Sequence, residues 1–276
     1  LRRRAQAGRA QDAAVGREGR SPLDVVERHR DAAVVAEVDL DGGAVEAVAE
    51  LRGMVDDIRL VTNTTSMPRA NILGKLNGMG FGISEDELLT PAGMAVRYCR
   101  SKGYERVNLM VSKALRHDLE EIHVIGTDEQ ADAIVMGDLG SMFNADTLNH
   151  AFRQLMCGAD LITLQHNRYW KKPDGLVLDV GAYAAALEYA SGVEPVVVGK
   201  PSRDFFEMAL ADAGAAAGDA LMVGDDIEGD VGGGLGAGID SVLVRTGKYT
   251  EAKAAESEVD PTATIDSIAE LPAFIG

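Results

Sequence analysis

The sequence predicts an α/β fold in which a parallel sheet carries helices on its faces and a second domain is inserted. Short apolar runs alternate with helical patterns along the chain, and this βαβα order is typical of parallel sheets. Short apolar runs like those before residue 66 occur again at 195–198, and the segment between has strand signals of its own. With 276 residues the chain is long enough for a sizeable core and two domains.

The amino-terminal part is expected to begin with an extension and then to form a first strand and helix. Residues 1–31 are rich in Arg, Ala and Gly and lack a long apolar stretch, so we expect a poorly ordered extension. A strand at 32–38 leads into Asp39-Leu40-Asp41-Gly42, and a helix follows with Val45, Val48 and Leu51 on one stripe. The core therefore begins near residue 32.

Two further strand and helix pairs complete the first part of the core, which we place at 32–104. A buried strand at 58–61 ends in Thr62-Asn63-Thr64-Thr65, and Ser66 can cap a helix that is entered through Pro68. Four apolar side chains of that helix are expected to face inward: Ile72, Leu73, Leu76 and Met79. A strand-like piece at 87–90 then leads into a helix from Pro91 to about Lys102.

Residues 105–194 carry a separate series of strand and helix signals, and we assign them to the inserted domain. Strands are expected at 107–111, 122–125, 133–136 and 161–164. A helix at 144–156 carries apolar residues on one face, and turn-rich sequence around 171–175 precedes a helix near 181–190.

Residues 195–276 return to the core pattern. The strand at 195–198 ends in Gly199-Lys200-Pro201, and Ser202 caps the helix that follows. Leu221-Met222-Val223 forms a buried strand that stops at Gly224-Asp225-Asp226, and a glycine-rich helix from about Glu228 leads to a final strand at 241–244. Each glycine weakens that helix by roughly 1 kcal/mol relative to Ala, so close packing against the sheet must hold it.

Composition argues against several classes of function. The net charge of −17 disfavours binding to nucleic acid, and no apolar run approaches the ~20 residues that a membrane helix needs. The two cysteines, Cys99 and Cys157, form no CxxC motif, so we expect a reducing compartment and a cytoplasmic location. The five histidines lack the paired spacing of a zinc helix.

Polar side chains follow four of the predicted strands: Asp39 and Asp41, Thr62 and Asn63, Lys200, and Asp225 and Asp226. If these strands are parallel neighbours, the side chains converge on the sheet edge where ligands of open α/β sheets bind. Taken alone, the acidic turn is equally well explained as a solvated helix cap. Together the groups supply a nucleophilic carboxylate, a cation and oxygen ligands for Mg²⁺, which phosphoryl transfer requires.

The segments at these strand ends resemble, in order, the four motifs of the haloacid dehalogenase (HAD) superfamily of phosphatases: Asp39-x-Asp41-Gly42, Val61-Thr62-Asn63-Thr64-Thr65, Val198-Gly199-Lys200-Pro201 and Gly224-Asp225-Asp226-x-x-x-Asp230. Further segments at 83–87, 168–171, 186–190 and 246–249 are similar to those of subfamily IIA, which carries a C2-type cap. The resemblance covers roughly 38–275. It implies a Rossmann-like core and an α/β cap at 105–194.

The resemblance also implies roles for the carboxylates. Asp39 would be the nucleophile and a Mg²⁺ ligand, and Asp225 would be a second Mg²⁺ ligand. Asp41 would act as general acid and base and would offer its backbone carbonyl to the metal. Asp226 and Asp230 would support the metal-bound water and Lys200.

For the phosphoryl group, the resemblance implies that Thr62, Asn63 and Thr64 hold oxygens and that Lys200 neutralises their charge. His166, Asn167 and Arg168 stand where a loop of the family's cap can face the active site, although an ordinary surface turn explains them as well. Cap-mediated dimers occur among relatives, so a homodimer through the cap is consistent with the resemblance. The expected partner is a small phosphorylated substrate, with no nucleic acid and no membrane.

The first motif departs from the family pattern, because Gly42 is followed directly by Gly43-Ala44 and the usual flap of about ten residues is missing. Either Asp39 is the nucleophile and its flap is deleted, or residues 35–42 occupy the flap position and the first motif is lost. Residues 20–33 contain no DxD, so the second register would leave no nucleophile. We favour Asp39 because of its literal DxDG, although Glu37 is unusual in a buried strand.

The sequence leaves two alternative functions, the first suggested by the incomplete first motif and the second by a run of glycines. A catalytically impaired HAD-fold protein would bind Mg²⁺ and phosphate without turnover. Nucleotide-cofactor binding through Gly234-x-Gly236-x-Gly238 is weakly supported, since those glycines follow the acids instead of opening the loop after the strand.

Overall fold

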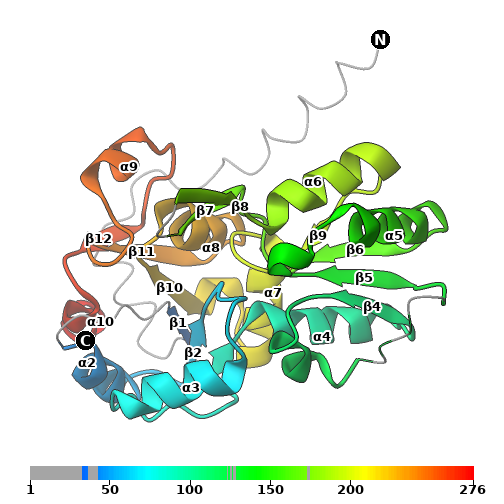
Figure 1. The fold of residues 1–276 in the computed structure, drawn as a ribbon. Helices are drawn as coiled ribbons and strands as arrows, with labels where there is room; N and C mark the ends of the chain where they lie inside the picture. Colours follow the sequence, from blue (N-terminus) through cyan, green and yellow to red (C-terminus); the bar gives the residue numbers. More distant parts are fainter. Residues whose placement is uncertain (1–32, 37–42, 123, 125, 127–128, 173–174) are drawn as a thin grey trace.

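The computed structural model describes residues 33–36, 43–122, 124, 126, 129–172 and 175–276 (Figure 1). Among these residues, six parallel strands form the larger sheet in the order β12-β11-β10-β1-β2-β3. The strands are β1 (Ala33–Ala36), β2 (Asp57–Val61), β3 (Leu88–Leu89), β10 (Ala220–Gly224), β11 (Asp240–Val244) and β12 (Ala263–Ile265). The predicted parallel α/β fold is confirmed. The expected extension at 1–31 lies outside the described residues.

A smaller parallel sheet has the order β4-β5-β6-β9 within the described part of the chain. Its strands are β4 (Val107–Met110), β5 (Ala133–Met136), β6 (Asp160–Thr163) and β9 (Val196–Val197). We expected the strand before Lys200 to join the other motif strands, and this was wrong, because β9 pairs with β6. The strand expected at 122–125 is reduced, among its described residues, to a single bridge between Val124 and Val107.

The turn-rich segment near 171–175 is part of an antiparallel hairpin, β7 (Tyr169–Lys172) and β8 (Gly175–Leu178). Sequence reasoning missed both strands. Strand β7 contacts α6, the helix that follows the hairpin in the chain. Within the ranges that the structure describes, the hairpin is a separate two-stranded sheet, paired with neither of the two parallel sheets.

The helices of the described residues are α2 (Ala44–Leu51), α3 (Arg69–Gly78), α4 (Pro91–Lys102), α5 (Ala145–Met156), α6 (Val180–Ser191), α7 (Arg203–Ala213), α8 (Gly233–Gly236), α9 (Glu251–Glu256) and α10 (Leu271–Ile275). Short 3₁₀ turns occur at Leu115–Leu119 (η1), Gly140–Met142 (η2), Ala217–Asp219 (η3) and Ile268–Glu270 (η5), and η4 (Ile227–Gly232) is a π-helix. As predicted, Ser202 caps α7 by accepting a hydrogen bond from the N–H of Phe205.

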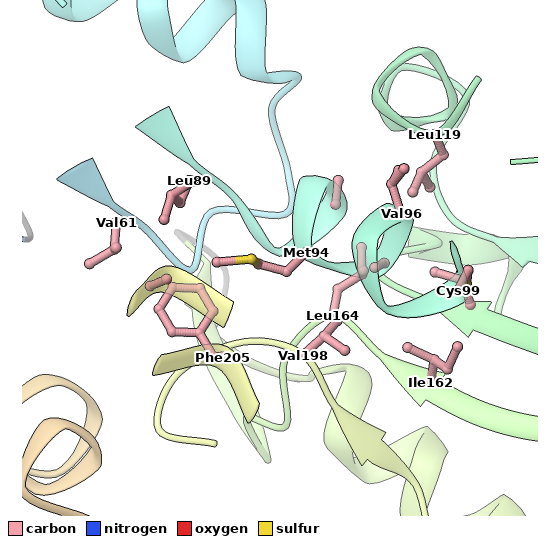
Figure 2. Packing of buried hydrophobic residues seen from close by; sticks show 14 of the residues in the cluster. Val61, Leu89, Met94, Val96, Cys99, Leu119, Ile162, Leu164, Val198 and Phe205 are labelled. Atoms are coloured by element: carbon pink, nitrogen blue, oxygen red, sulfur yellow. The ribbon is translucent and has the colours of Figure 1, made fainter. Parts of the chain in front are cut away.

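One hydrophobic cluster connects the two sheets. Figure 2 shows α4 and α7 contributing Met94 and Phe205 to a continuous set of buried side chains. Val61 and Met222 of the larger sheet belong to the same cluster as Ile162 of the smaller sheet. The two sheets therefore share a core through the helices between them.

The glycine-rich segment after β10 packs tightly, as the sequence predicted. A Cβ on Gly233 would overlap the ring of Phe206, and a Cβ on Gly234 would come within 2.5 Å of Ser241 Oγ. These glycines permit a contact that any side chain would prevent. Tertiary packing thus offsets their low helix propensity.

Helix α3 differs from its prediction at both ends. Met79 follows the helix and is 43% exposed, while Ile72, Leu73 and Leu76 are partly buried against the core. The helix begins at Arg69, and its first N–H donates to Asp118 Oδ2 at 2.7 Å. A residue from η1 of the inserted segment, not Ser66, therefore caps the helix that follows Thr62-Asn63-Thr64-Thr65.

This cap gives a pH-dependent prediction. Burial raises the pKa of the Asp118 carboxyl, and the hydrogen bond from Arg69 opposes the shift only in part. Above the raised pKa the folded protein holds a half-buried charge that the unfolded chain hydrates freely, so ionisation of Asp118 lowers stability. Asp118→Asn keeps an oxygen for Arg69 and should therefore be more stable than wild type at pH 7.

The advantage of Asp118→Asn should shrink as the pH falls through the raised pKa towards the ordinary value of about 3.9, where both states of the wild type are protonated. Urea denaturation of both proteins at pH 7 and pH 4.5 measures this difference. An advantage of equal size at both pH values would contradict the predicted cause.

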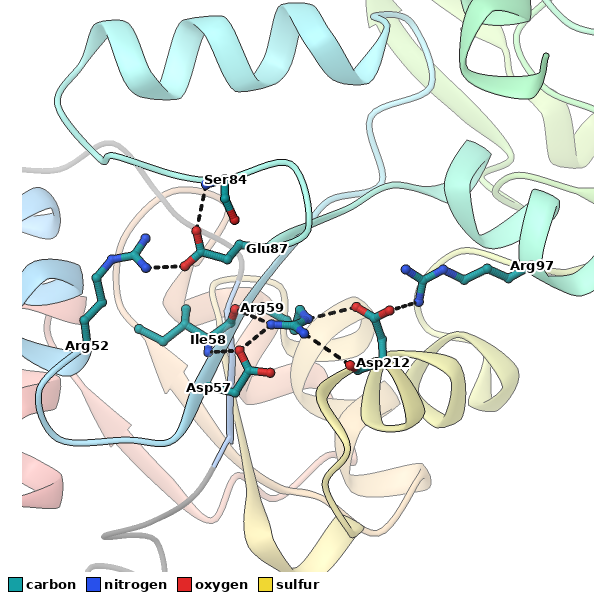
Figure 3. A network of polar contacts seen from close by, with 8 residues as sticks. All are labelled: Arg52, Asp57, Ile58, Arg59, Ser84, Glu87, Arg97 and Asp212. Atoms are coloured by element: carbon teal, nitrogen blue, oxygen red, sulfur yellow. Dashed lines mark hydrogen bonds and ion pairs between the residues drawn. The ribbon is translucent and has the colours of Figure 1, made fainter. Parts of the chain in front are cut away.

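A charged network also links the larger sheet to α4 and α7 (Figure 3). Arg59 of β2 bonds Asp212 of α7 through Nε at 2.8 Å and also pairs with Asp57. Asp212 pairs in turn with Arg97 of α4. Strand β2 is thus fixed to the helices that carry the shared core.

None of the helices in the described ranges is both long enough and apolar enough to cross a membrane.

Candidate active site

The acidic turn after β10 holds a buried carboxylate. Asp225 is 6% exposed, and its Oδ2 accepts a hydrogen bond from the N–H of Lys248 at 2.7 Å. Its other oxygen, Oδ1, is buried and has no hydrogen-bond partner among the described residues. A carboxylate oxygen left unpaired in the interior is costly unless a ligand completes it. Asp225 therefore fits the role of a cation ligand.

Lys200 and Asp230 form a buried ion pair beside this turn. Lys200 Nζ lies 2.6 Å from Asp230 Oδ1, and the two side chains are 2% and 1% exposed. Asp230 Oδ2 also accepts a hydrogen bond from the N–H of Asp226 at 3.1 Å. One carboxylate thus connects the lysine to the acidic turn.

Close packing at Gly224 makes this arrangement specific. A Cβ on Gly224 would lie 2.5 Å from Asp230 Oδ2, which no side chain tolerates. The π-helix η4 places Asp230 there, and Asp226 caps η4 by accepting a hydrogen bond from the N–H of Gly229 at 3.1 Å. Glycine at the end of β10 therefore lets the carboxylate of Asp230 approach the strand.

Asn63 holds the main chain of Lys200. Its Nδ2 donates to the carbonyl oxygen of Lys200 at 2.8 Å, and the N–H of Lys200 donates to Asn63 Oδ1 at 2.9 Å. Both polar atoms of the side-chain amide are thereby used. The side chain of Asn63 fixes Lys200 in this structure, whereas we had assigned it to a phosphoryl oxygen.

The side-chain hydroxyls of Thr62 and Thr64 lie next to each other at the end of β2. Their Oγ1 atoms lie 2.9 Å apart, and the N–H of Thr64 donates to Thr62 Oγ1 at 3.1 Å. Both side chains are half-buried. One hydroxyl donates to the other, so in this arrangement the pair has one proton left to donate to an anion at this strand end.

The first motif is not part of this geometry, because Asp39 and Asp41 lie outside the described residues. Strand β1, which precedes them, runs between β10 and β2, with Ala36 level with Val223 and Leu60. In the described part of the chain no three His, Cys, Asp or Glu side chains form a metal site. A complete Mg²⁺ site therefore needs carboxylates in addition to Asp225.

The sequence analysis noted the segment 246–249 after β11 only as a resemblance and did not predict its contact with Asp225. The N–H of Lys248 anchors Asp225, and Gly247 makes this turn with a φ of 56° that favours glycine. The Lys248 ammonium is 4.0 Å from Asp226 Oδ2 and half-exposed, so that pair contributes little. The sequence signal that could have indicated this contact is the pair Gly247-Lys248, which follows β11, the strand next to β10.

The turn at His166, Asn167 and Arg168 is exposed and follows β6 after two residues. Leu164, which precedes this turn, packs its carbonyl oxygen against Gly199, where a Cβ would overlap it. The smaller sheet therefore meets the site next to Lys200.

The fold and the site together define an enzyme of the HAD type, and comparisons with known proteins agree. The sequence model described as Haloacid dehalogenase-like hydrolase matches residues 33–125, and the model described as HAD-hydrolase-like matches 197–271. The chain belongs to the haloacid dehalogenase-like hydrolases, which confirms the resemblance of its motifs. By class it is a HAD-type phosphoric monoester hydrolase.

Several relatives cover most of the chain. It is 39% identical to phospholysine phosphohistidine inorganic pyrophosphate phosphatase of Bos taurus over 83% of both chains. It is also 39% identical to haloacid dehalogenase-like hydrolase domain-containing protein 2 of Homo sapiens, over 82% of this chain and 85% of that protein. Among solved structures, p-nitrophenyl phosphatase from Archaeoglobus fulgidus is similar with a TM-score of 0.80 and 27% identity, covering 88% of this chain and 99% of that one.

Proposed function

We propose that the chain is a Mg²⁺-dependent phosphatase that hydrolyses small phosphorylated metabolites through an aspartyl phosphate on Asp39. The observation that carries the proposal is the buried pair of Lys200 and Asp230, which is joined to Asn63 on one side and to the Asp225 turn on the other. Three segments far apart in the sequence thus bring a cation, hydroxyl donors and a carboxylate to one place. Phosphoryl transfer is catalysed mainly by such positioning and charge neutralisation.

In the first step of the proposed reaction, a carboxylate oxygen of Asp39 attacks phosphorus, and the bond to the leaving-group oxygen breaks. Asp41 gives its proton to that oxygen. In the second step Asp41 takes a proton from water, whose oxygen attacks phosphorus and releases Asp39 and phosphate.

The remaining residues hold the phosphoryl group during both steps. Thr62 and Thr64 would donate to its oxygens, and Lys200 would balance their charge while Asn63 and Asp230 keep the lysine in place. The unpaired Oδ1 of Asp225 supports the assignment of a metal ligand, together with Asp39 and the backbone carbonyl of Asp41. Bound Mg²⁺ would supply further positive charge to the phosphoryl oxygens.

The position of β1 supports Asp39 as the nucleophile. This strand fills the place between β2 and β10, and Asp39 follows its last residue, Ala36, by three positions. If residues 35–42 were a flap, a different segment would be needed for this central strand.

Residues 105–194 act as the cap in this proposal.

The proposal extends to the setting of the enzyme. Cys99 and Cys157 are both free thiols, which suits a reducing compartment such as the cytoplasm. A homodimer formed through the cap is part of the same proposal, and size-exclusion chromatography with light scattering tests it.

Phosphate release from p-nitrophenyl phosphate and from inorganic pyrophosphate, two compounds named in the relatives, tests the function. We expect hydrolysis that requires Mg²⁺ and falls at least about a thousandfold in Asp39→Asn, because the amide is no nucleophile. Activity that survives this change would sink the assignment. Binding of Mg²⁺ and phosphate without turnover in the wild type would favour the catalytically impaired alternative, which the missing flap suggests.

A further inference from the structure

Gln165 and Asp179 form a buried polar pair, and the β7–β8 hairpin lies between these two residues in the sequence. Gln165 follows β6 after one residue, and Asp179 lies between β8 and α6. The two residues are 3% and 8% exposed, and Gln165 Nε2 donates to Asp179 Oδ1 at 2.6 Å. The pair therefore joins the chain entering the hairpin to the chain leaving it.

Each member of the pair also holds a backbone N–H. Gln165 Oε1 accepts from Asn167 at 2.5 Å, and Asp179 Oδ1 accepts from Val180 at 2.8 Å as the cap of α6. These partners fix the orientation of the Gln165 amide, since one demands its oxygen and the other its nitrogen. Every member of this small network is hydrogen-bonded, so the buried groups rigidify the turn at 166–168.

Main-chain contacts tighten the same turn. The N–H of Asp179 donates to the carbonyl of Arg168 at 3.2 Å, and the N–H of Gly181 donates to the carbonyl of Asn167 at 3.0 Å. A Cβ on Gly181 would come within 2.5 Å of the carbonyl oxygen of His166. The turn is thus held against the first turn of α6.

The turn begins at the wall of the active site. The carbonyl of Leu164, just before Gln165, packs on Gly199, and a Cβ at Gly199 would also lie 3.0 Å from Asn63 Oδ1. Gly199 precedes Lys200, whose peptide Asn63 holds. The exposed turn formed by His166, Asn167 and Arg168 therefore starts beside the phosphoryl end of the site.

We propose that Gln165 and Asp179 are positioning residues that set the place of the 166–168 turn and the hairpin, and through them the binding of the substrate's leaving group. The inference rests on the proposed phosphatase function and deepens it. Neither residue touches substrate. Their bond fixes the side of the site that the alcohol or amine portion of the substrate faces, while Lys200 and Asn63 hold the phosphoryl end.

Gln165→Glu tests the pair because it keeps the acceptor for Asn167 but sets a carboxylate against Asp179. We expect the KM for p-nitrophenyl phosphate to rise roughly tenfold and kcat to stay within about twofold, because binding shared by ground and transition states is lost. The inhibition constant of inorganic phosphate, which lacks a leaving group, should stay within about twofold.

Rescue separates positioning from general damage. Gln165→Glu with Asp179→Asn removes the contact between two carboxylates, but Asp179 Oδ1 accepts from both Gln165 and Val180, so the asparagine can keep only one of these bonds and KM should return only part of the way to wild type. Ser191→Ala is the matched control, because Ser191 Oγ donates to Leu187 at 2.7 Å at the far end of α6. It loosens the same helix away from the hairpin and should leave KM unchanged.

Hydrogen exchange of the full-length protein gives a readout that needs no turnover. The amides of Asn167 and Gly181 should exchange at least about tenfold faster in Gln165→Glu and recover in part in the double variant. If Gln165→Glu does not fold, Gln165→Leu removes both hydrogen bonds without burying a charge, and the same changes are expected.

Unchanged exchange at these amides would overturn the proposal whether or not the protein is active. So would an unchanged KM, a parallel rise in KM and in the inhibition constant of phosphate, or failure of the double variant to recover. Absence of hydrolysis in the wild type is a different result, which would refute the proposed function and leave the exchange test to decide the positioning role.

Discussion

Asp230→Ala is expected to destabilise the protein by about 3–5 kcal/mol and to abolish hydrolysis. The reason is burial, since Lys200 Nζ lies 2.6 Å from Asp230 Oδ1 and the side chains are 2% and 1% exposed. The change removes the carboxylate that pairs with the buried Lys200 ammonium, and breaking a buried ion pair costs that much in comparable cases. For a chain of this size the melting temperature should fall by roughly 6–20 °C. Thermal denaturation and phosphate release measure the two effects.

The double variant Lys200→Met with Asp230→Ala separates stability from catalysis. The double variant removes the buried lysine charge together with the carboxylate that pairs with it, so part of the lost stability should return. Hydrolysis should stay absent, because the cation that balances the phosphoryl group is gone. Stability losses that simply add in the double variant would show that the two side chains are not coupled.

Asp225→Asn is expected to have opposite effects on stability and activity. Within the part of the chain that the structure describes, no group bonds the buried Asp225 Oδ1, so replacing the charged carboxylate with a neutral amide should stabilise the metal-free protein by about 1–2 kcal/mol. The same change removes a proposed Mg²⁺ ligand and should lower the rate of hydrolysis by about a hundredfold or more. Binding sites commonly carry such a stability cost.

Mg²⁺ titration during thermal denaturation checks this prediction. At a hundred times its dissociation constant, Mg²⁺ should stabilise the wild type by about 2.7 kcal/mol. Asp225→Asn should show little of this stabilisation. If the variant responds to Mg²⁺ as the wild type does, Asp225 is not a ligand.

Local signals predicted much of the fold. Helix α4 was predicted from Pro91 to about Lys102 and is found at these bounds, and the structure shows that Thr90 caps it and that Gly103 ends it in the left-handed conformation. The β7–β8 hairpin was missed because apolar residues such as Leu176 are exposed, so its sequence lacks the alternation of buried and exposed side chains that marks a strand. Its pairing also depends on partners in the opposite strand, which linear sequence does not show. Strand β12 was missed as well, since its three residues include the polar Thr264.

The site was predicted as a set of residues but not as a set of contacts. The motifs identified Lys200 and Asp230, and the structure pairs them. The amide of Asn63 bonds the peptide of Lys200, and the N–H of Lys248 bonds Asp225, and neither partner is visible in linear spacing. The roles of Asp39 and Asp41 stay predictions, because these residues lie outside the described ranges.

The cluster shared by α4, α7 and both sheets bears on how substrate enters. A hinge-like, rigid-body separation of the sheets would expose Met94 and Phe205 to water, and each large buried side chain contributes about 1.5–3 kcal/mol. Such an opening would consume much of a typical domain's stability. Entry and exit through movements of surface loops would leave these side chains buried, so product release in this enzyme should follow loop kinetics and not the parting of two domains.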